Sequence, residues 1–280
     1  MLKHSGDRLR SLLGSAETIP FMGVYDAFSA AIAGRYYQTL FLSGYGFGAS
    51  YYGLPDIGFI AWADMVNFVQ RLRTILPEHL LLVDIDDGYV DVQTACHVVR
   101  QLEQLGAAGV ILEDQKRPRR CGHVDGKQLL DTDSYGKKLT NVLAARDRLF
   151  VVARTDATEL PEIIQRCKHY ANIGADAVLA DGIKDLGILK TLKSEVSVPI
   201  VFNQIAGGKS PTCTLTELNN AGVSLVNYST PCLFAAQAAI TAEMERLSQA
   251  DGRLSERGLS NCNQVLQRSL DNSSRLRAYD

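Results

Sequence analysis

The chain has 280 residues, of which 46% are hydrophobic and 21% charged, with 29 Lys and Arg against 31 Asp and Glu. This length suits one large domain or two ordinary ones, and the composition is that of a globular protein with a substantial core. The nearly balanced charge, −2 at pH 7, and the lack of a basic stripe argue against a nucleic-acid partner.

The sequence contains no apolar run near the roughly 18 residues that cross a bilayer, and its first twenty residues are too polar for a secretory signal. We therefore expect a cytoplasmic protein with no membrane partner, whose N-terminus forms a short amphipathic segment. The six cysteines are scattered without a Cys-x-x-Cys pair, which fits reduced thiols better than a disulfide framework.

Eight short apolar runs recur along the chain, and a segment with helical features follows each of them. Near-continuous apolar runs are typical of strands that are buried on both faces of a parallel sheet. The runs are FMGVYD (from Phe21), TLFLSG (from Thr39), LLLVDID (from Leu80), GVILED (from Gly109), LFVVART (from Leu149), AVLADG (from Ala177), PIVFNQ (from Pro199) and VSLVNYS (from Val223).

Helices are expected over residues 62–76, 91–105, 161–173 and 215–221. In the first of these, Met65, Phe68, Val69 and Leu72 recur at helical spacing, and Pro77 ends the helix. The eightfold alternation predicts an α/β protein built as one (β/α)8 (TIM) barrel domain over residues 1–280, with a doubly wound sheet as the alternative. The segment from Pro231 onward holds two further helices, and we assign residues 245–280 to a C-terminal helical tail.

Polar residues follow nearly every apolar run, where the carboxyl ends of barrel strands would carry an active site. Burying so many charges together is costly unless they pair or bind a metal, although any one of them could be a solvated loop residue or a helix cap. The residues are Asp26, Ser43, Gly44, Asp84, Asp86, Glu113, Asp114, Arg154, Asp156, Asp181, Asn203 and Gln204.

The densest of these groups is VDIDDGY. Asp84 and Asp86 are two residues apart, so on a strand their side chains share one face. With Glu113 from the next strand they would form an oxygen-rich site of the kind that hard cations prefer. The sequence therefore predicts a Mg²⁺ or Mn²⁺ site.

A second group lies in a long non-periodic stretch, residues 115–134, which we interpret as a gating loop. Nearby cations lower a thiol's pKa, which would make Cys121 a proton relay or nucleophile, although the cysteine could also be incidental. Gly122 and Gly126 would give the loop freedom to close. The cationic neighbours of Cys121 are Arg119, Arg120, His123 and Lys127.

Small residues after the second run form a third group. Ser43, Gly44 and Tyr45 begin the segment SGYGFG, whose backbone N–H groups could approach an anion. A plain turn is the alternative.

With these residues in view, the chain resembles the isocitrate lyase and phosphoenolpyruvate mutase superfamily. The resemblance runs in collinear order over about residues 20–245. The segments that carry it are GVYDAFSA (23–30), SGYGFGASYYGLPDIG (43–58), VDIDDGY (83–89), EDQKRPRRCGHVDGK (113–127), ARTDA (153–157) and GADAVLADG (174–182).

The resemblance implies a (β/α)8 barrel whose C-terminal helix is exchanged between subunits of a homotetramer or dimer. It implies that Asp84, Asp86 and Glu113 form the metal site, with Asp56 as an outer member. It assigns the substrate carboxylate to Ser43, Gly44 and Tyr45, and it makes Cys121 the gating-loop cysteine of the branch that contains methylisocitrate lyase, dimethylmalate lyase and oxaloacetate hydrolase. The remaining implied substrate residues are Arg154, Asn203, Asp181 and Gly122.

Such enzymes cleave a carbon–carbon bond in a small 2-hydroxy or 2-oxo di- or tricarboxylic acid. The metal would polarise the 2-oxygen, and Arg154 would stabilise the developing charge. Cys121, with His123 beside it, would deliver a proton as general acid. Tyr45 and a metal-bound water are both candidates for the base.

Four residues depart from the family pattern. Asp87 stands where Thr is usual and adds an acid beside the metal site. Phe41 replaces a Tyr, Asp181 replaces a longer Glu, and Phe234 aligns with an Arg of methylisocitrate-type members. The lost cation favours a smaller acid. Phosphonopyruvate-type or carboxyphosphonoenolpyruvate-type P–C bond chemistry and a non-catalytic metabolite-binding barrel are the alternatives.

Overall fold

The protein is described here by a computed structural model that covers residues 4–14, 17–254 and 258–277. The strands are β1 (Ile19–Val24), β2 (Thr39–Leu42), β3 (Leu80–Asp84), β4 (Gly109–Glu113), β5 (Phe150–Thr155), β6 (Ala177–Ala180), β7 (Ile200–Gln204) and β8 (Val223–Tyr228). The helices are α1 (Ser5–Leu13), α2 (Ala27–Ala33), α3 (Gly44–Phe47), the π-helix η1 (Gly48–Tyr52), α4 (Trp62–Ile75), α5 (Val92–Gln104), α6 (Thr132–Ala145), α7 (Leu160–Ile173), α8 (Leu186–Glu195), α9 (Leu215–Asn220), α10 (Pro231–Gln249) and α11 (Leu259–Arg277).

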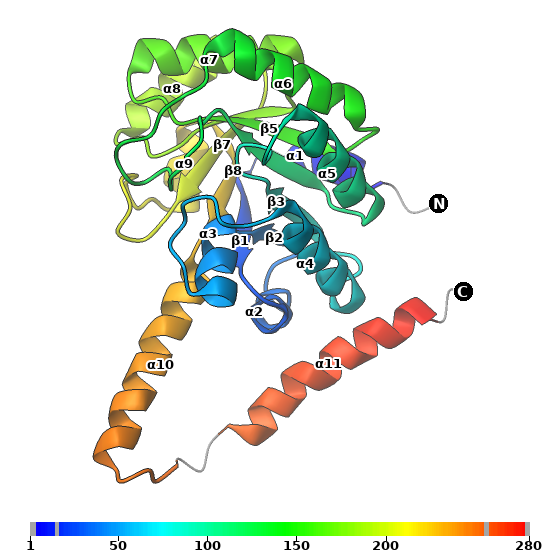
Figure 1. The fold of residues 1–280 in the computed structure, drawn as a ribbon, viewed down its shortest axis with the longest axis vertical. Helices are drawn as coiled ribbons and strands as arrows, with labels where there is room; N and C mark the ends of the chain where they lie inside the picture. Colours follow the sequence, from blue (N-terminus) through cyan, green and yellow to red (C-terminus); the bar gives the residue numbers. More distant parts are fainter. Residues whose placement is uncertain (1–3, 15–16, 255–257, 278–280) are drawn as a thin grey trace.

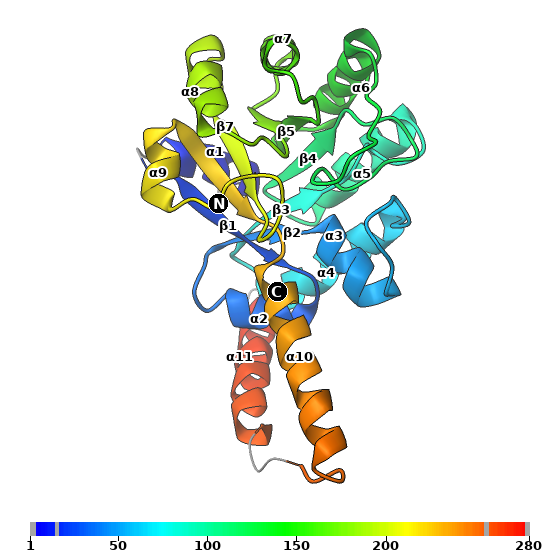
Figure 2. The ribbon, with the colours of Figure 1, turned by 90° about the vertical axis from the view of Figure 1, so that its left-hand side faces the viewer.

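The strands form a closed barrel in chain order, in which each strand is parallel to the next and β8 pairs with β1. Helices surround this barrel (Figures 1 and 2). Each strand coincides with one of the eight apolar runs, so the barrel prediction is confirmed. A doubly wound sheet is open at its edges, and the pairing of β8 with β1 therefore excludes that alternative.

Side chains alternate along each strand between the surrounding helices and the barrel interior. Apolar residues fill the barrel interior, and on seven strands the residue two positions after the last of them reaches the carboxyl end of the barrel. The apolar layer includes Phe41, Leu82, Ile111, Val152, Leu179, Val201 and Leu225. Two positions later stand Ser43, Asp84, Glu113, Arg154, Asp181, Asn203 and Asn227.

Helix α1 closes the other end of the barrel. Leu9 is fully buried in the same interior cluster as Phe21 and Phe150. The backbone of Gly6 lies so close to the carbonyl of Arg148 that a Cβ would collide with it. The amphipathic N-terminal segment predicted from the sequence is therefore an integral part of the core.

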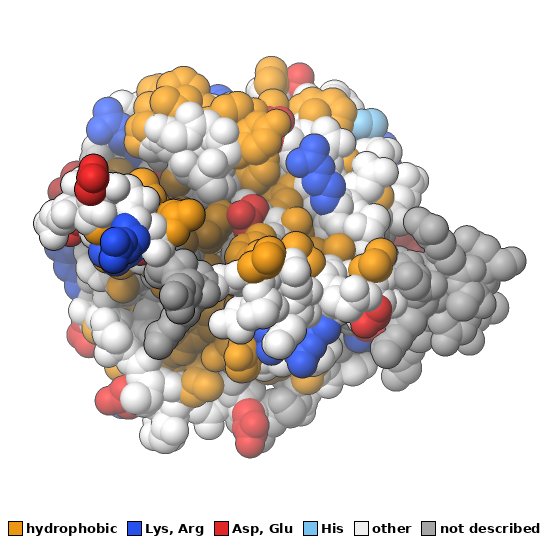
Figure 3. All heavy atoms as spheres, turned by 90° about the horizontal axis from the view of Figure 1, so that it is seen from below, with side chains coloured by type: hydrophobic (Ala, Val, Ile, Leu, Met, Phe, Trp, Pro, Cys, Tyr) orange, Lys and Arg blue, Asp and Glu red, His pale blue; other side chains and the backbone are white. Residues whose placement is uncertain are grey.

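The two helices predicted after Pro231 are present as α10 and α11. Helix α10 leads away from the barrel (Figure 1) and has no buried residue, so Ile240 and Met244 are exposed. Hydrophobic side chains are spread over the face from which α10 projects (Figure 3). Helix α11 packs against α2 and α4, where Asn272 Nδ2 donates to the carbonyl of Ile75 over 3.1 Å. None of the described helices is long and apolar enough to cross a membrane.

Candidate active site

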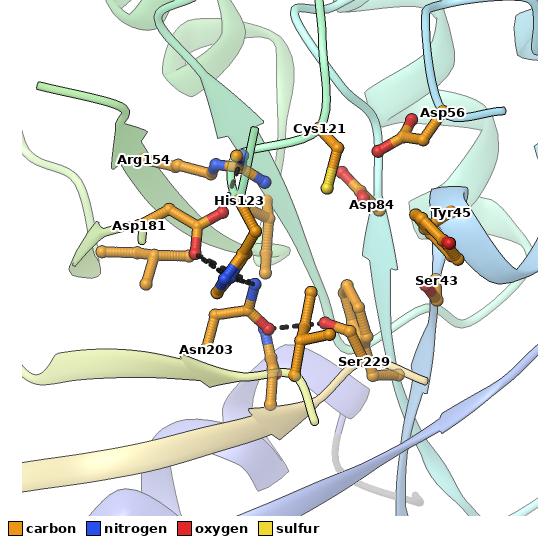
Figure 4. A pocket seen from close by; sticks show the side chains of 16 residues that line it. Ser43, Tyr45, Asp56, Asp84, Cys121, His123, Arg154, Asp181, Asn203 and Ser229 are labelled. Carbon is orange, nitrogen blue, oxygen red and sulfur yellow. Dashed lines mark hydrogen bonds and ion pairs between the residues drawn. The ribbon is translucent and has the colours of Figure 1, made fainter. Parts of the chain in front are cut away.

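The polar ends of the strands surround a small cavity at the carboxyl end of the barrel (Figure 4). The barrel's apolar layer provides its floor through Phe41, Ile111 and Leu179. The structure brings most of the predicted site residues to this cavity. Those that line it are Ser43, Tyr45, Asp56, Asp84, Cys121, Gly122, His123, Arg154, Asp181 and Asn203. Gly44, Asp86 and Glu113 lie directly behind this lining, in contact with it.

Arg119 lies among the carboxylates of the predicted metal site. Its Nε is 2.8 Å from Glu113 Oε1, its Nη1 is 3.4 Å from Asp86 Oδ1, and the same Nη1 also pairs with Asp56. The Arg119 side chain is only 2% exposed. The loop that carries Cys121 therefore places a buried cation between the carboxylates.

The prediction that Asp84 and Asp86 share one face of a strand is wrong. Strand β3 ends at Asp84, and Asp86 lies beyond it with φ of 50°, in the left-handed region. The two side chains meet nevertheless, because both approach the backbone of Gly44. A Cβ at Gly44 would lie 3.1 Å from Asp84 Oδ2 and 3.2 Å from Asp86 Oδ1, so the close approach depends on glycine.

The donor set fits a divalent cation in charge and chemistry. Asp86 Oδ1 and Glu113 Oε2 are buried and accept no hydrogen bond from the described residues, and each has only an ion-pair contact, with Arg119 at 3.4 Å and with Arg154 at 3.3 Å. Burial raises the pKa of Asp84 and Glu113, and it raises the pKa of Asp86 to about 7, because the surrounding cations do not balance the carboxylates. Among the described residues, however, no three His, Cys, Asp or Glu side chains are already arranged around one point as metal ligands. Arg119 occupies the space between them.

Arg154 joins this cluster to a second carboxylate group. Its guanidinium makes two parallel bonds of 3.0 Å to Asp156 and lies 2.7 Å from Asp181 Oδ2 and 3.3 Å from Glu113 Oε2. Lys127 Nζ, from the loop, also reaches Asp156 Oδ1 at 2.9 Å. Arg154 is thus fixed in position by acids on three sides, as a preorganised anion-binding group must be.

A chain of hydrogen bonds connects His123 to the far wall of the cavity (Figure 4). The backbone N–H of Lys209 donates to His123 Nδ1 over 2.9 Å, so in the neutral ring Nε2 carries the proton, 3.3 Å from Asp181 Oδ1. Asn203 Nδ2 donates to the same oxygen over 3.0 Å, and Ser229 Oγ lies 2.5 Å from Asn203 Oδ1. Burial alone would raise the pKa of Asp181, but Arg154 and His123 outweigh it and hold that pKa below its usual range.

The predicted acidification of Cys121 is wrong. Burial raises the pKa of its thiol to about 12, and Asp56 adds to the effect. The flanking cations do not face the sulfur, because Arg119 binds the carboxylates, Lys127 binds Asp156, and Arg120 is exposed. The backbone N–H of Cys121 is fixed by the carbonyl of Asp56 at 3.1 Å. At neutral pH the cavity therefore contains a protonated thiol.

At Gly122 the surrounding side chains leave no space for a Cβ atom. A Cβ there would lie 2.5 Å from Arg154 Nη2 and would collide with Asp181. Gly126, with φ of 82°, does take the left-handed conformation. The predicted stretch 115–134 also ends earlier, because helix α6 begins at Thr132 with Asp131 as its N-cap.

Residues 9–248 match a protein-family model whose description is phosphoenolpyruvate phosphomutase. The chain belongs to this family. Its wider membership in the isocitrate lyase and phosphoenolpyruvate mutase superfamily, indicated by the motifs, is thereby confirmed.

Three members of the superfamily give the scale of the similarity. The chain is 32% identical to the 2-methylisocitrate lyase of Halalkalibacterium halodurans over 232 residues, which are 81% of this chain and 76% of that protein. A structure of oxaloacetate acetylhydrolase with the inhibitor 3,3-difluorooxalacetate superposes with a TM-score of 0.90 at 27% identity, covering 98% of this chain and 96% of that one. A structure of 2,3-dimethylmalate lyase gives a TM-score of 0.90 at 27% identity, covering 100% and 96%.

Phe234, one of the departures from the family pattern, contacts Tyr45 of the cavity lining. Phe234, at the start of α10, packs edge-on against Tyr45 with 6.3 Å between the ring centroids. Burial and the nearby Cys121 raise the pKa of Tyr45, so this phenol stays protonated at neutral pH. Tyr45 and Gly44 form the first turn of α3, where the helix itself supplies no acceptor for the backbone N–H groups. Ser43 caps that turn, since its Oγ accepts from the N–H of Gly46 over 3.1 Å.

Three residues at the site were not predicted in these positions. Arg119 was noted only as a neighbour of Cys121. Asn227 and Ser229, which line the cavity from β8 and the residue after it, were not selected at all. The alternation of side chains along the strands could have identified Asn227. This residue follows the interior residue Leu225 by two positions, as Asn203 follows Val201. The Asn227 Oδ1 atom is buried without a hydrogen-bond partner.

Proposed function

We propose that this chain is a divalent-metal-dependent lyase that cleaves a carbon–carbon bond in a small 2-hydroxy or 2-oxo acid of the methylisocitrate, dimethylmalate or oxaloacetate type. One observation carries the proposal. A carboxylate cluster, a fixed arginine and a protonated cysteine thiol meet at a single cavity. The match to a lyase-containing superfamily supports the same chemistry.

The metal would be held by Asp84, Asp86 and Glu113, with Asp56 in an outer position, after Arg119 leaves the space between them. Oxygen ligands of this kind favour Mg²⁺ or Mn²⁺. When bound, such an ion stabilises negative charge on the substrate's 2-oxygen as the C–C bond breaks.

The protein's own groups account for the remaining steps. The N–H groups at the start of α3 and the guanidinium of Arg154 would hold a substrate carboxylate. The departing fragment carries an electron pair on carbon and needs a proton. Because its thiol is protonated, Cys121 is suited to donate that proton as general acid. Tyr45, also protonated, is better suited to donating a hydrogen bond than to removing the substrate's hydroxyl proton.

The lining favours a small acid. It contains one arginine, Arg154, and no lysine, and Arg154 already pairs with three acids. Phe234 brings no charge to the position where methylisocitrate-type members carry an arginine. A third carboxylate would therefore lack a cationic partner. We expect a dicarboxylic acid to be preferred over a tricarboxylic one.

We also propose that the protein works as a homo-oligomer in the cytoplasm. Helix α10 has no buried residue, and exposed apolar side chains such as Ile240 and Met244 would be covered by a second subunit. Light scattering of the purified protein tests this, since a monomeric mass would contradict it. Exchange of the C-terminal helix between subunits stays a prediction.

The deciding experiment is an activity screen of the purified protein with Mg²⁺ on isocitrate, methylisocitrate, dimethylmalate, oxaloacetate and phosphonopyruvate. Release of a 2-oxo acid, glyoxylate, oxalate or phosphate is followed directly. Turnover of a carboxylic acid that is lost with EDTA supports the proposal. Phosphate release from phosphonopyruvate alone would instead assign P–C chemistry, and binding of an oxo acid without any turnover would assign a non-catalytic barrel.

A further inference from the structure

The acid that replaces the family's threonine, Asp87, does not face the metal site. We expected it to add an acid beside the metal site, but its carboxylate is turned toward the loop between β4 and α6 (residues 114–131). There it receives two parallel hydrogen bonds from Arg117: Nε to Oδ2 at 2.8 Å and Nη2 to Oδ1 at 2.8 Å. Arg117 Nε also lies 3.1 Å from the carbonyl of Tyr89. A threonine hydroxyl could not form this two-pronged pair.

Asp87 is held rigidly by the barrel framework. Its side chain is 4% exposed, Lys138 Nζ of α6 donates to its backbone carbonyl over 2.7 Å, and its Oδ1 accepts from the N–H of Tyr89 at 3.2 Å. Arg117 is different, since its side chain is 41% exposed and it belongs to the loop, four residues before Cys121. The pair thus joins a fixed anchor to a loop group that can separate from it.

Two of the loop's other ion pairs lie away from the cavity, namely Asp114 with Arg166 at 3.1 Å and the exposed Asp125 with Lys209 at 2.5 Å. The ion pairs of the remaining three loop residues end on acids of the site. Arg119 binds Glu113, Lys127 binds Asp156, and His123 binds Asp181. A metal would compete with Arg119 for Glu113, and Asp181 lines the cavity, so the contacts of Arg119 and His123 would change as the site fills. Neither Asp87 nor Arg117 lines the cavity. Ligand binding therefore leaves this pair untouched and, unlike the pair of the exposed Asp125, it is fixed on a buried carboxylate.

We infer that Asp87 and Arg117 form a latch that holds the loop closed over the cavity, and that they act as positioning residues for Cys121. The latch keeps the thiol at the cavity whether or not metal and substrate are present. If the pair is broken, the expected loss of turnover rests on the proposed role of Cys121 as proton donor. The expected opening of the loop does not depend on that role.

The loop can be followed without any substrate through the reactivity of Cys121. In the closed loop Cys121 is only partly exposed, and opening would expose its thiol further to solvent and to alkylating reagents. The experiment measures the rate of iodoacetamide modification of each cysteine by peptide mass spectrometry. Cys167, which is fully buried in the core, reports global unfolding in the same sample.

The test compares Arg117→Gln with Arg120→Gln, a matched control in the same loop. Arg120 is exposed and its side chain makes no ion pair within the described residues. We expect Cys121 of Arg117→Gln to react on the order of tenfold faster, since a two-pronged charge-assisted pair is lost. Cys121 of Arg120→Gln should react at the wild-type rate. Because Arg117 is partly exposed, its replacement removes no core packing, and the reaction rate of Cys167 should stay unchanged.

Asp87→Thr, which restores the family's usual residue, should speed the reaction of Cys121 as Arg117→Gln does. The double variant should add nothing further, because either change breaks the same pair. A wild-type rate in Arg117→Gln, or additive effects of the two changes, would overturn the latch. If Cys121 reacts faster while kcat on the identified substrate stays constant, the latch holds and the proton-donor role of Cys121 fails. If kcat falls while KM changes little, both are supported.

Discussion

The cavity has a charged half and a neutral half, although both are built by the same alternation along the strands. Strands β3 to β6 end in charged groups, and β7, β8 and β2 end in amides and hydroxyls. The charged half contains Asp84, Asp86, Glu113, Arg154 and Asp181. The neutral half contains Asn203, Asn227, Ser229 and Ser43. The fold therefore fixes where site residues stand, and the residue type alone decides what each wall can do.

This difference assigns separate tasks to the two walls. Fixed charges stabilise charge that develops during bond cleavage, so the charged half should control kcat. Neutral hydrogen-bonding groups contribute similarly to substrate and transition state, so the neutral half should control KM and the choice of acid. Variants on the two sides should separate these effects.

The largest effect is expected from Asp84→Ala in the charged half. Removing this carboxylate should abolish stabilisation of the protein by Mg²⁺ in thermal unfolding and lower turnover roughly 10³–10⁴-fold, as loss of the metal's several kcal/mol implies. Asp133→Ala, which removes an exposed acid from α6, should leave both unchanged. Persistent Mg²⁺ stabilisation of Asp84→Ala would show that the metal site is assigned to the wrong residues.

Cys121→Ser comes next. A hydroxyl is a much weaker acid than a thiol, so turnover should fall about 10²–10³-fold while oxo-acid binding stays nearly intact. Steady-state kinetics and calorimetric binding of oxalate measure the two quantities separately. Cys262→Ser on α11 serves as the control and should behave like the wild type. Unchanged turnover in Cys121→Ser would remove the thiol from the mechanism.

The same thiol predicts a pH dependence of stability. Its folded pKa of about 12 exceeds the ordinary value of 9.0, so above about pH 9 the unfolded chain loses a proton that the folded chain keeps. Stability from this group is therefore complete below pH 9 and declines as the pH rises toward 12. At pH 10 we expect Cys121→Ser to gain roughly 1 kcal/mol relative to the wild type, compared with their difference at pH 7. Denaturant unfolding at both pH values measures this, and an equal difference at the two would contradict the raised pKa.

The barrel was predictable because eight near-continuous apolar runs, each followed by a helix, indicate parallel strands that are buried on both faces. Only the pairing of β8 with β1 excludes a doubly wound sheet. Because polar residues follow the apolar runs at the carboxyl end of the barrel, Glu113, Arg154 and Asn203 lie at one site. Asp84 and Asp86 converge for another reason, since the chain turns after β3 and Gly44 leaves room for both. Sequence spacing alone could not reveal that turn.

The directions of the loop side chains were not predictable. Four cationic residues flank Cys121 in sequence, but the extended loop turns them toward different partners, and burial raises the thiol's pKa instead. Asp87 was likewise expected at the metal site and faces Arg117. Contacts between a loop and a distant turn depend on the path of the backbone, which no local pattern encodes.

The smallest change in kinetics is expected from substitution of Asn227, the residue that the alternation of side chains along β8 could have identified. Its Oδ1 is buried without a partner beside the neutral wall, where a substrate hydroxyl could supply the missing donor. Asn227→Ala should therefore raise KM up to about tenfold and change kcat little, because one neutral hydrogen bond is lost from both ground and transition states. Ser248→Ala on the exposed part of α10 is a suitable control. A fall in kcat at constant KM would show that the neutral half also stabilises the transition state, and the division between the two walls would then fail.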